Sequence, residues 1–160
     1  MDTDDLFVKL VEALDRDIEL LATLRYRLIV LGALAGADQG PSIPLAVREI
    51  ENAYEDLRIA DLVRAAATSR VAQVFVLDPM PRLDELAVRA SGAWSEVLME
   101  RRRCIIETVI GIENLADTVR SAMGRRASLA KEALAFLRVD AGATYGRSVV
   151  RGGVLVEGSI

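Results

Sequence analysis

The chain has 160 residues and a formal net charge of −4, and 52% of its residues are hydrophobic but only 4% aromatic. This length predicts one domain, and the acidic balance gives the molecule as a whole no electrostatic reason to bind nucleic acid. With no histidine and a single cysteine, the sequence excludes an intrachain disulfide scaffold, the usual zinc sites and histidine-based acid–base catalysis.

The first predicted helix runs from about Asp4 to about Ala35, roughly 48 Å at 1.5 Å per residue. Mostly apolar side chains recur at alternating steps of four and three residues, which is the spacing of a coiled-coil seam. The seam consists of Phe7, Val11, Leu14, Ile18, Leu21, Arg25 and Leu28. We expect Leu14, Ile18 and Leu21 to be core residues.

A second helix is predicted from about Pro44 to about Val76, after a Gly- and Pro-rich turn that begins at Gly36. The short connection predicts that it runs antiparallel to the first helix. Two prolines in VFVLDPMPRL end it, and a short helix is expected from about Arg82 to Arg89.

A third long helix is predicted from about Ala93 to about Met123, followed after Gly124 by a short last helix, Arg125 to Val139. Its seam consists of Leu98, Arg102, Ile105, Val109, Ile112, Ala116, Val119 and Met123. Residues 1–40 carry an excess of acids and residues 93–131 an excess of bases, so these two segments would attract each other as neighbours. The fold class is therefore all-α, an antiparallel bundle of long coiled-coil-like helices.

The C-terminal tail differs in kind from the rest of the chain. Residues 1–140 are expected to form the helical domain, and residues 141–160 a tail rich in glycine and valine. The valine pairs on either side of Arg151-Gly152-Gly153 are typical of a β-hairpin with a glycine turn, or of a segment that orders on a partner.

Several polar residues need an interpretation. Asp15, Asp17 and Glu19 are expected on a solvated face, because alternate positions of a helix point to different sides. Arg25 and Arg102 interrupt apolar seams, so either they reach water from the seam edge or they meet a carboxylate such as Asp17 across the bundle.

Cys104, Trp94, Tyr54 and Gly111 are the remaining residues that attract notice. A catalytic thiol needs a base and the chain has no histidine, so Cys104 is expected to be a small core residue. Trp94 and Tyr54 are expected to anchor the core. Gly111 lies in a helix interior at a cost of about 1 kcal/mol, which favours a close helix approach there.

One stretch suggests an enzyme. The segment LDRDIELLATLRYRL, Leu14 to Leu28, resembles the first helix of the all-helical chorismate mutases. That family uses arginines on this helix, a downstream lysine and a glutamate to bind a dicarboxylate. Between Lys9 and Lys131 this chain has no lysine, so we expect no enzymatic activity.

The layout as a whole resembles the FlgN family of flagellar export chaperones, of the actinobacterial type. The resemblance covers most of the chain. It is carried by LVEALDRDIELLATLRYRLIVL, VREIENAYEDLRIADLVRA, the short LDELA segment, RRASLAKEALAFL after the third long helix, and the TYG that begins at Thr144.

The resemblance implies a cytoplasmic chaperone for type III export. Its partners would be hook-associated proteins of the FlgK and FlgL type, bound through their C-terminal helices, and a component of the flagellar export gate; no cofactor or metal is implied. The acidic start MDTDDLF and the lack of a bilayer-spanning apolar run also favour the cytoplasm.

The expected partner-binding residues lie on the last helix. They are Leu129, Ala133, Phe136 and Leu137, which share its apolar side; the alternative is that they complete the core. The resemblance implies export-gate contact for Tyr145. The other function class that the pattern allows is a structural or regulatory coiled-coil protein.

Overall fold

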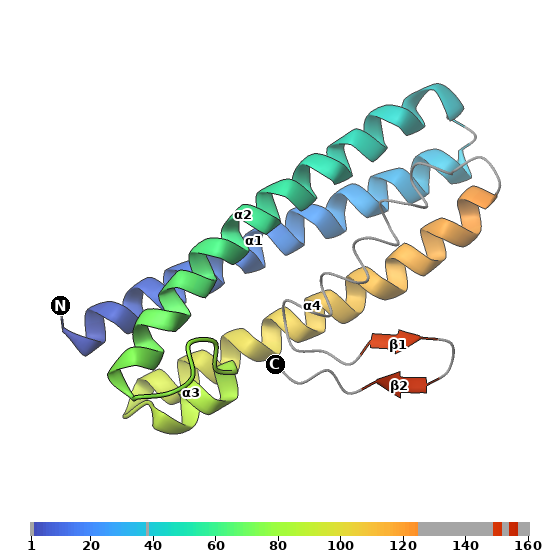
Figure 1. Cartoon of the computed structure of the whole chain (residues 1–160). Coiled ribbons are helices and arrows are strands. Elements are labelled where there is room, and N and C mark those ends of the chain that lie inside the picture. Colours follow the sequence, from blue (N-terminus) through green and yellow to red (C-terminus); the bar gives the residue numbers. More distant parts are fainter. Residues whose placement is uncertain (1, 38, 125–148, 152–153, 157–160) are drawn as a thin grey trace.

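The computed structural model describes residues 2–37, 39–124, 149–151 and 154–156 (Figure 1). Its elements in chain order are α1 (Thr3–Gly36), a short 3-10 helix (Gly40–Ser42), α2 (Ile43–Val74), α3 (Leu83–Arg89), α4 (Ala93–Met123), β1 (Val149–Arg151) and β2 (Val154–Val156). The three long helices and the short α3 agree with the predicted ones to within about two residues at each end. The predicted helix Arg125 to Val139 lies outside the described residues.

α1 and α2 form an antiparallel hairpin, as predicted (Figure 1). The last turn of α1 closes with a hydrogen bond from the backbone N–H of Ala37 to the carbonyl of Ala33, at 3.0 Å. The Gly40–Ser42 helix then reverses the chain. Pro44 lies in the first turn of α2, where its missing N–H leaves no hydrogen bond unmade.

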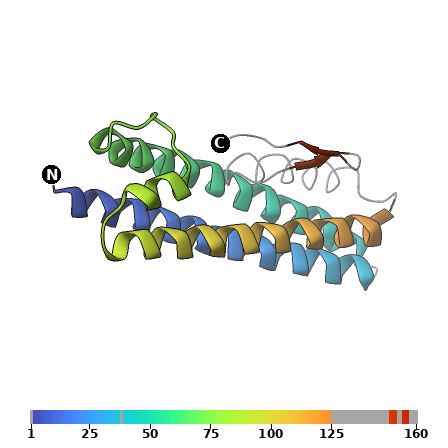
Figure 2. The same ribbon diagram turned by 90° about the horizontal axis from the view of Figure 1, so that it is seen from below.

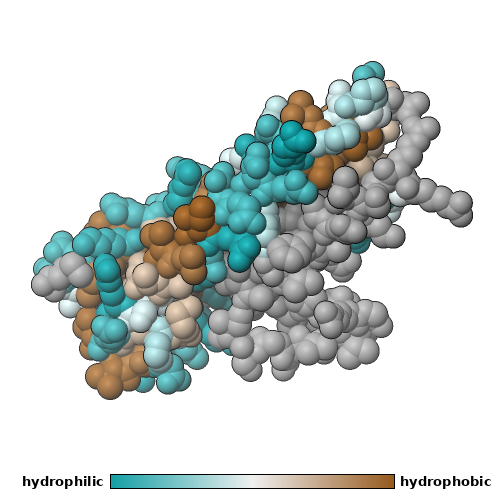
Figure 3. All heavy atoms as spheres, turned by 45° about the horizontal axis from the view of Figure 1, so that its top comes forward, coloured by the Kyte–Doolittle hydropathy of each residue, from teal (hydrophilic) through white to brown (hydrophobic). Residues whose placement is uncertain are grey.

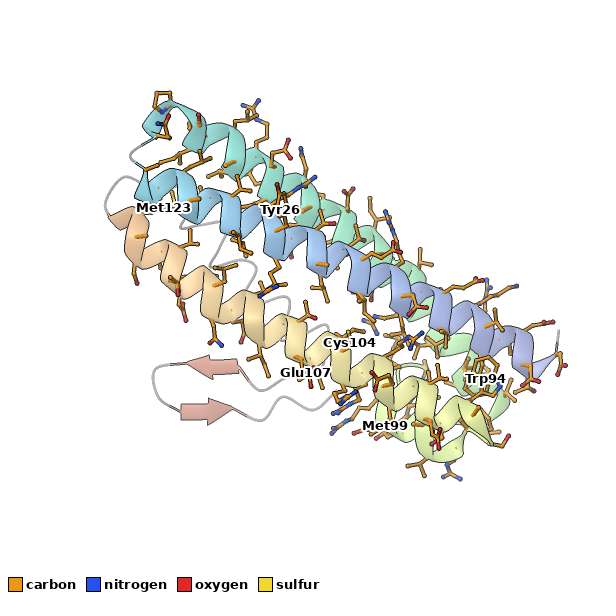
Figure 4. All side chains as sticks on the ribbon, turned by 180° about the vertical axis from the view of Figure 1, so that it is seen from behind. Tyr26, Trp94, Met99, Cys104, Glu107 and Met123 are labelled. Carbon is orange, nitrogen blue, oxygen red and sulfur yellow. The ribbon has the colours of Figure 1, made fainter. Side chains whose placement is uncertain are left out.

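α4 packs along α1 and runs parallel to it (Figure 2). Trp94, near the start of α4, stacks on Phe7 near the start of α1. Near the other end, a Cβ at Gly32 would lie 3.1 Å from Cγ2 of Val119. Figure 4 shows Trp94 and Met123 at opposite ends of the molecule. Because α2 runs back along α1, the chain reaches α3 at the end where α1 begins, and α4 starts from that same end. α1 lies between α2 and α4.

The buried stripe of α1 is wider than the predicted seam. One row is fully buried as predicted and includes Leu14 and Leu21; the second fully buried row is Leu10, Asp17, Leu24 and Leu31. The other row of the predicted seam is less deeply buried: Val11 and Ile18 are half-buried and Arg25 is exposed. The cause is that α1 packs against two helices, which moves the centre of its buried face between them.

The seam predicted for α4 is confirmed. Its members Leu98, Ile105, Val109, Ile112, Ala116, Val119 and Met123 are buried, and only Arg102 is half-exposed. α4 packs against one long helix and the short α3 rather than between two long ones, so a narrow stripe is enough to cover its contact.

The junction between α2 and α3 contains the one described non-glycine residue with a positive φ, Val76 at +54°. The N–H of Val76 donates to the carbonyl of Gln73 at 3.3 Å, and that of Leu77 to the carbonyl of Ala72 at 3.0 Å. This is the Schellman termination, in which glycine usually takes the left-handed position. Val76 is also 91% exposed, so the strain is not offset by burial of its own side chain.

In the tail, β1 and β2 pair in antiparallel register, with Val149 opposite Val156 and Arg151 opposite Val154. The pairing places the two valine-rich segments on either side of the glycine pair that the sequence pattern singles out. Two strands of three residues bury little on their own and are marginal in water.

Candidate functional site

A buried ion pair joins α1 to α2. The side chain of Asp17 is 0% exposed and that of Arg64 is 10% exposed, and Nε of Arg64 lies 3.1 Å from Oδ2 of Asp17. Arg64 also bonds to Asp61, one turn earlier on α2. The expectation that Asp17 lies on a solvated face is therefore wrong, and its partner across the bundle is Arg64 rather than Arg25 or Arg102.

The sequence contains a signal for this pair that the seam analysis missed. Asp17 stands seven residues from Leu10 and from Leu24, and Arg64 seven from Leu57 and from Val71. All four of these leucine and valine side chains are buried. A charged residue in each of two apolar seven-residue series indicates a matched pair, because an isolated charge there would be costly. The pair fits a structural role, fixing the register of α1 against α2.

The three consecutive arginines of α4 each contact a carboxylate. Nε of Arg101 lies 2.6 Å from Oδ1 of Asp15 on α1, and this hydrogen bond raises the pKa of Arg101 above its ordinary value. Arg103 pairs with a glutamate on its own helix, at 2.6 Å, which likewise raises the pKa of Arg103. Arg102 lies 3.6 Å from Asp84 of α3. The contacts of Arg101 and Arg102 join α4 to α1 and α3, which favours a role in helix packing over one in binding phosphate.

Trp94 ties the beginning of α4 to the beginning of α1. Its ring stacks on Phe7 with centroids 5.4 Å apart, and its indole N–H donates to Oδ1 of Asp4 at 2.8 Å. Tyr54 is buried, as expected of a core anchor, whereas Trp94 is half-buried and packs against the core. Cys104 is half-buried, which is less than expected of a core residue.

The closest approach of α1 and α4 is not at Gly111. A Cβ there would meet Nε of Arg25 at 3.8 Å, an ordinary contact, whereas one at Gly32 would meet Val119 at 3.1 Å. Gly32 is the glycine that the packing requires, and the expectation about Gly111 is wrong.

In the part of the chain that the structure describes, the strongest candidate for a functional surface is a row of hollows between α1 and α2, which we call the α1/α2 groove. The first hollow measures about 560 Å³ and the second about 230 Å³, and the two share Ala13, Arg16 and Val63. A third, of about 490 Å³, lies toward the turn and includes Tyr26 (Figure 4). Arg16 and Thr23 are seven residues apart on α1, so all three open on the same side of the hairpin.

The groove is bordered by large apolar side chains that remain in water. Ile59, Leu62 and Val63 of α2 are 62%, 71% and 59% exposed, and each lines the first or the second hollow. In the view of Figure 3, where α2 comes forward, hydrophobic surface lies in distinct patches among hydrophilic surface. Exposed apolar side chains gathered beside a hollow, rather than scattered singly, are typical of a protein-binding surface.

The charges at the groove are unevenly distributed. The first hollow is lined by Lys9, Arg16 and Arg70 but by only one acid, Glu12. In the third hollow Arg27 faces Glu49 across the hairpin, with Nε and Oε2 3.5 Å apart, so the charges there balance. One end of the groove is therefore basic within an acidic chain.

Neither a metal site nor a membrane span is found in the part of the chain that the structure describes. No three or more side chains among Cys, Asp and Glu there converge in a way that would hold a metal ion. None of the described helices combines the length and the apolar character that crossing a bilayer requires.

The partner-binding residues predicted from the sequence are Leu129, Ala133, Phe136 and Leu137, and the predicted gate contact is Tyr145. All five lie outside the described residues, so these assignments stay predictions. The sequence analysis missed the α1/α2 groove, although Ile59, Leu62 and Val63 stand at i, i+3 and i+4 and therefore form an apolar stripe on one side of α2. Comparison of the chain with protein-family models, curated proteins and solved structures finds no match.

Proposed function

We propose that this protein binds an amphipathic helix of a partner protein and protects that helix before export. The observation that carries the proposal is the α1/α2 groove, in which exposed Ile59, Leu62 and Val63 border hollows. A groove between two helices receives the apolar face of a third helix through side chains spaced three and four residues apart.

The export role rests on the resemblance to FlgN-type chaperones. In this role the protein is cytoplasmic, its partners are hook-associated proteins of the FlgK or FlgL type, and it needs no cofactor. Leu129, Ala133, Phe136 and Leu137 would add a second contact with the substrate, and Tyr145 would contact the export gate.

An affinity pull-down from the native lysate tests this role. The tagged full chain should retain hook-associated proteins, identified by mass spectrometry. A matched bait with Leu62→Asn and Val63→Asn should retain less of them, because both side chains are exposed and their replacement removes apolar contact without opening the core. Equal capture by both baits would remove the groove from the proposal, and an eluate without hook-associated proteins would contradict the export role.

The alternative function is that of a structural or regulatory coiled-coil protein. The coiled-coil spacing of the seams of α1 and α4 favours it, because helices with this spacing also associate between chains. Sedimentation equilibrium distinguishes the two functions. A stable homo-oligomer in which Leu62→Asn lowers the association constant would support the alternative, whereas a monomer that binds hook-associated proteins would support the chaperone.

We propose no catalytic role. The resemblance of the Leu14–Leu28 segment to chorismate mutases extends to one helix, and no lysine follows Lys9 until Lys131. Chorismate consumption in the presence of the full chain should equal the uncatalysed rate. Saturable consumption that follows enzyme concentration would contradict this and would give the mutase-like function first place.

A further inference from the structure

We propose that the basic end of the α1/α2 groove receives a helix whose apolar stripe is flanked by acidic side chains. The basic end is the first hollow, the one lined by Leu62, Val63 and the three bases Lys9, Arg16 and Arg70. This inference rests on the proposed helix-binding function and adds to it the location of the site and the chemistry of the partner.

Besides its three bases, the basic end has apolar lining residues that suit the side chains of a docked helix. Three of its lining side chains are small, those of Ala13, Ala66 and Ala67. Small residues leave room for a large apolar side chain to enter between two helices. Leu62 and Val63 line the same hollow and are mostly exposed. Covering these two side chains would remove apolar surface from water, which favours binding.

The charged residues that line the hollow determine which amphipathic helices it binds best. Three bases and one acid line the hollow, while the chain as a whole has a net charge of −4. Nη1 of Arg16 lies 3.2 Å from Oε2 of Glu19, but the two side chains are 61% and 70% exposed. Such exposed pairs contribute little, so Arg16 is able to turn toward an acid on a docked helix. Glutamates beside the apolar stripe of the partner would complete the complementarity.

A second copy of this chain is a poorer occupant. A two-fold contact through the basic end would bring Lys9, Arg16 and Arg70 of one copy against the same residues of the other. Like charges opposed in this way disfavour the contact. An anionic membrane surface matches the charge, but a flat surface does not use a hollow, whereas a helix with projecting side chains does.

Fluorescence anisotropy with two labelled peptides tests the proposal on the full chain. Both peptides carry the same leucine stripe over about 18 residues, a helix of roughly 27 Å. One has glutamate beside the stripe and the other lysine. The glutamate peptide should bind at least about tenfold more tightly, and added salt should reduce the difference because it screens the exposed charges.

Variants of the protein locate the site. Arg70→Glu should remove the preference for the glutamate peptide, and Leu62→Asn should weaken binding of both peptides by about tenfold or more. Arg48→Glu is the matched control, because Arg48 is exposed on the same helix and lines none of the hollows described here. It should leave the preference intact. Circular dichroism melts confirm that each variant is folded.

Three outcomes would overturn the inference. The first is equal binding of the two peptides, the second is an equal effect of Arg70→Glu and Arg48→Glu, and the third is binding to phosphatidylglycerol vesicles that Arg70→Glu abolishes while neither peptide binds. A failure of this inference can be distinguished from a failure of the proposed function. If hook-associated proteins are retained in the pull-down but Arg70→Glu and Leu62→Asn leave their capture unchanged, only the location and chemistry proposed here are wrong.

Discussion

Asp17 and Arg64 place two charges at positions where the neighbouring turns of both helices carry buried apolar residues. Their contact at 3.1 Å compensates for desolvation that would otherwise be costly for each ion. Replacing such a pair by apolar residues is often neutral or stabilising, whereas removing one partner is strongly destabilising. The contribution of the pair is thus better described as specificity of register than as net stability.

This description predicts a non-additive pair of mutations. Arg64→Met alone should lower the free energy of unfolding by about 3–5 kcal/mol, because it removes the cation beside a buried carboxylate. Adding Asp17→Leu should restore most of the loss, since no charge then remains at the contact. Urea melts of the wild type, the two single variants and the double variant measure this. A double variant as unstable as the sum of the single ones would contradict it.

Val76 adopts a left-handed backbone conformation that a β-branched side chain disfavours by about 1–2 kcal/mol. Val76→Gly should therefore raise the free energy of unfolding by about 1 kcal/mol, and because the side chain is exposed little packing is lost. Val76→Ala is the control and should change stability much less, because alanine keeps the Cβ. A Val76→Gly protein that is less stable than the wild type in chemical melts would show that the valine side chain makes a stabilising contact.

At the scale of elements, the bounds of the helices could be predicted from the sequence, but how deeply each helix face is buried could not. Gly36, Pro44 and Gly92 mark helix ends, and these signals act locally. A seven-residue period in α1 is satisfied equally by the row of Ile18 and by the row of Leu10 and Leu24. Which row is deeper depends on how many helices pack on α1, and this is a property of the tertiary fold.

The same limit applies to the candidate site. The α1/α2 groove exists because α4 covers one side of α1 and leaves the other side uncovered in the described part of the chain. In the sequence, Ile59, Leu62 and Val63 form an i, i+3, i+4 stripe that has the same spacing as a buried helix face. Their exposure becomes visible only once the packing direction of α2 is known.

Two glycines on the α1–α4 contact should respond oppositely to substitution. Gly111→Ala should stabilise by about 0.5–1 kcal/mol, because alanine favours the helix and its Cβ would make an ordinary contact at 3.8 Å. Gly32→Leu should destabilise by about 1–3 kcal/mol, because there is no room against Val119. Thermal melts of the two variants check the pair. Stabilisation by Gly32→Leu would mean that the two helices are not packed closely at this point.

At the scale of the whole molecule, the groove is a candidate binding surface on the described helices, and the sequence predicts a second one at the last helix. The two differ in what a mutation does. If Phe136 is a partner contact, Phe136→Ala should weaken substrate binding by about 2 kcal/mol or more and leave the melting curve almost unchanged. If it completes the core, the same change should lower stability by about 3–5 kcal/mol. A large loss of stability with unchanged affinity would end the assignment of this helix as a binding site.

The central claim is that the protein binds an amphipathic helix of an export substrate. Isothermal titration calorimetry of the full chain with the C-terminal helix of a FlgK-type protein from the same cells tests it most directly. We predict saturable binding with a Kd in the micromolar range or below, a free energy of about −8 kcal/mol or more favourable, and loss of affinity with Leu62→Asn. The absence of binding by a cooperatively folded protein, both to this peptide and to the full-length FlgK-type and FlgL-type proteins, would contradict the claim.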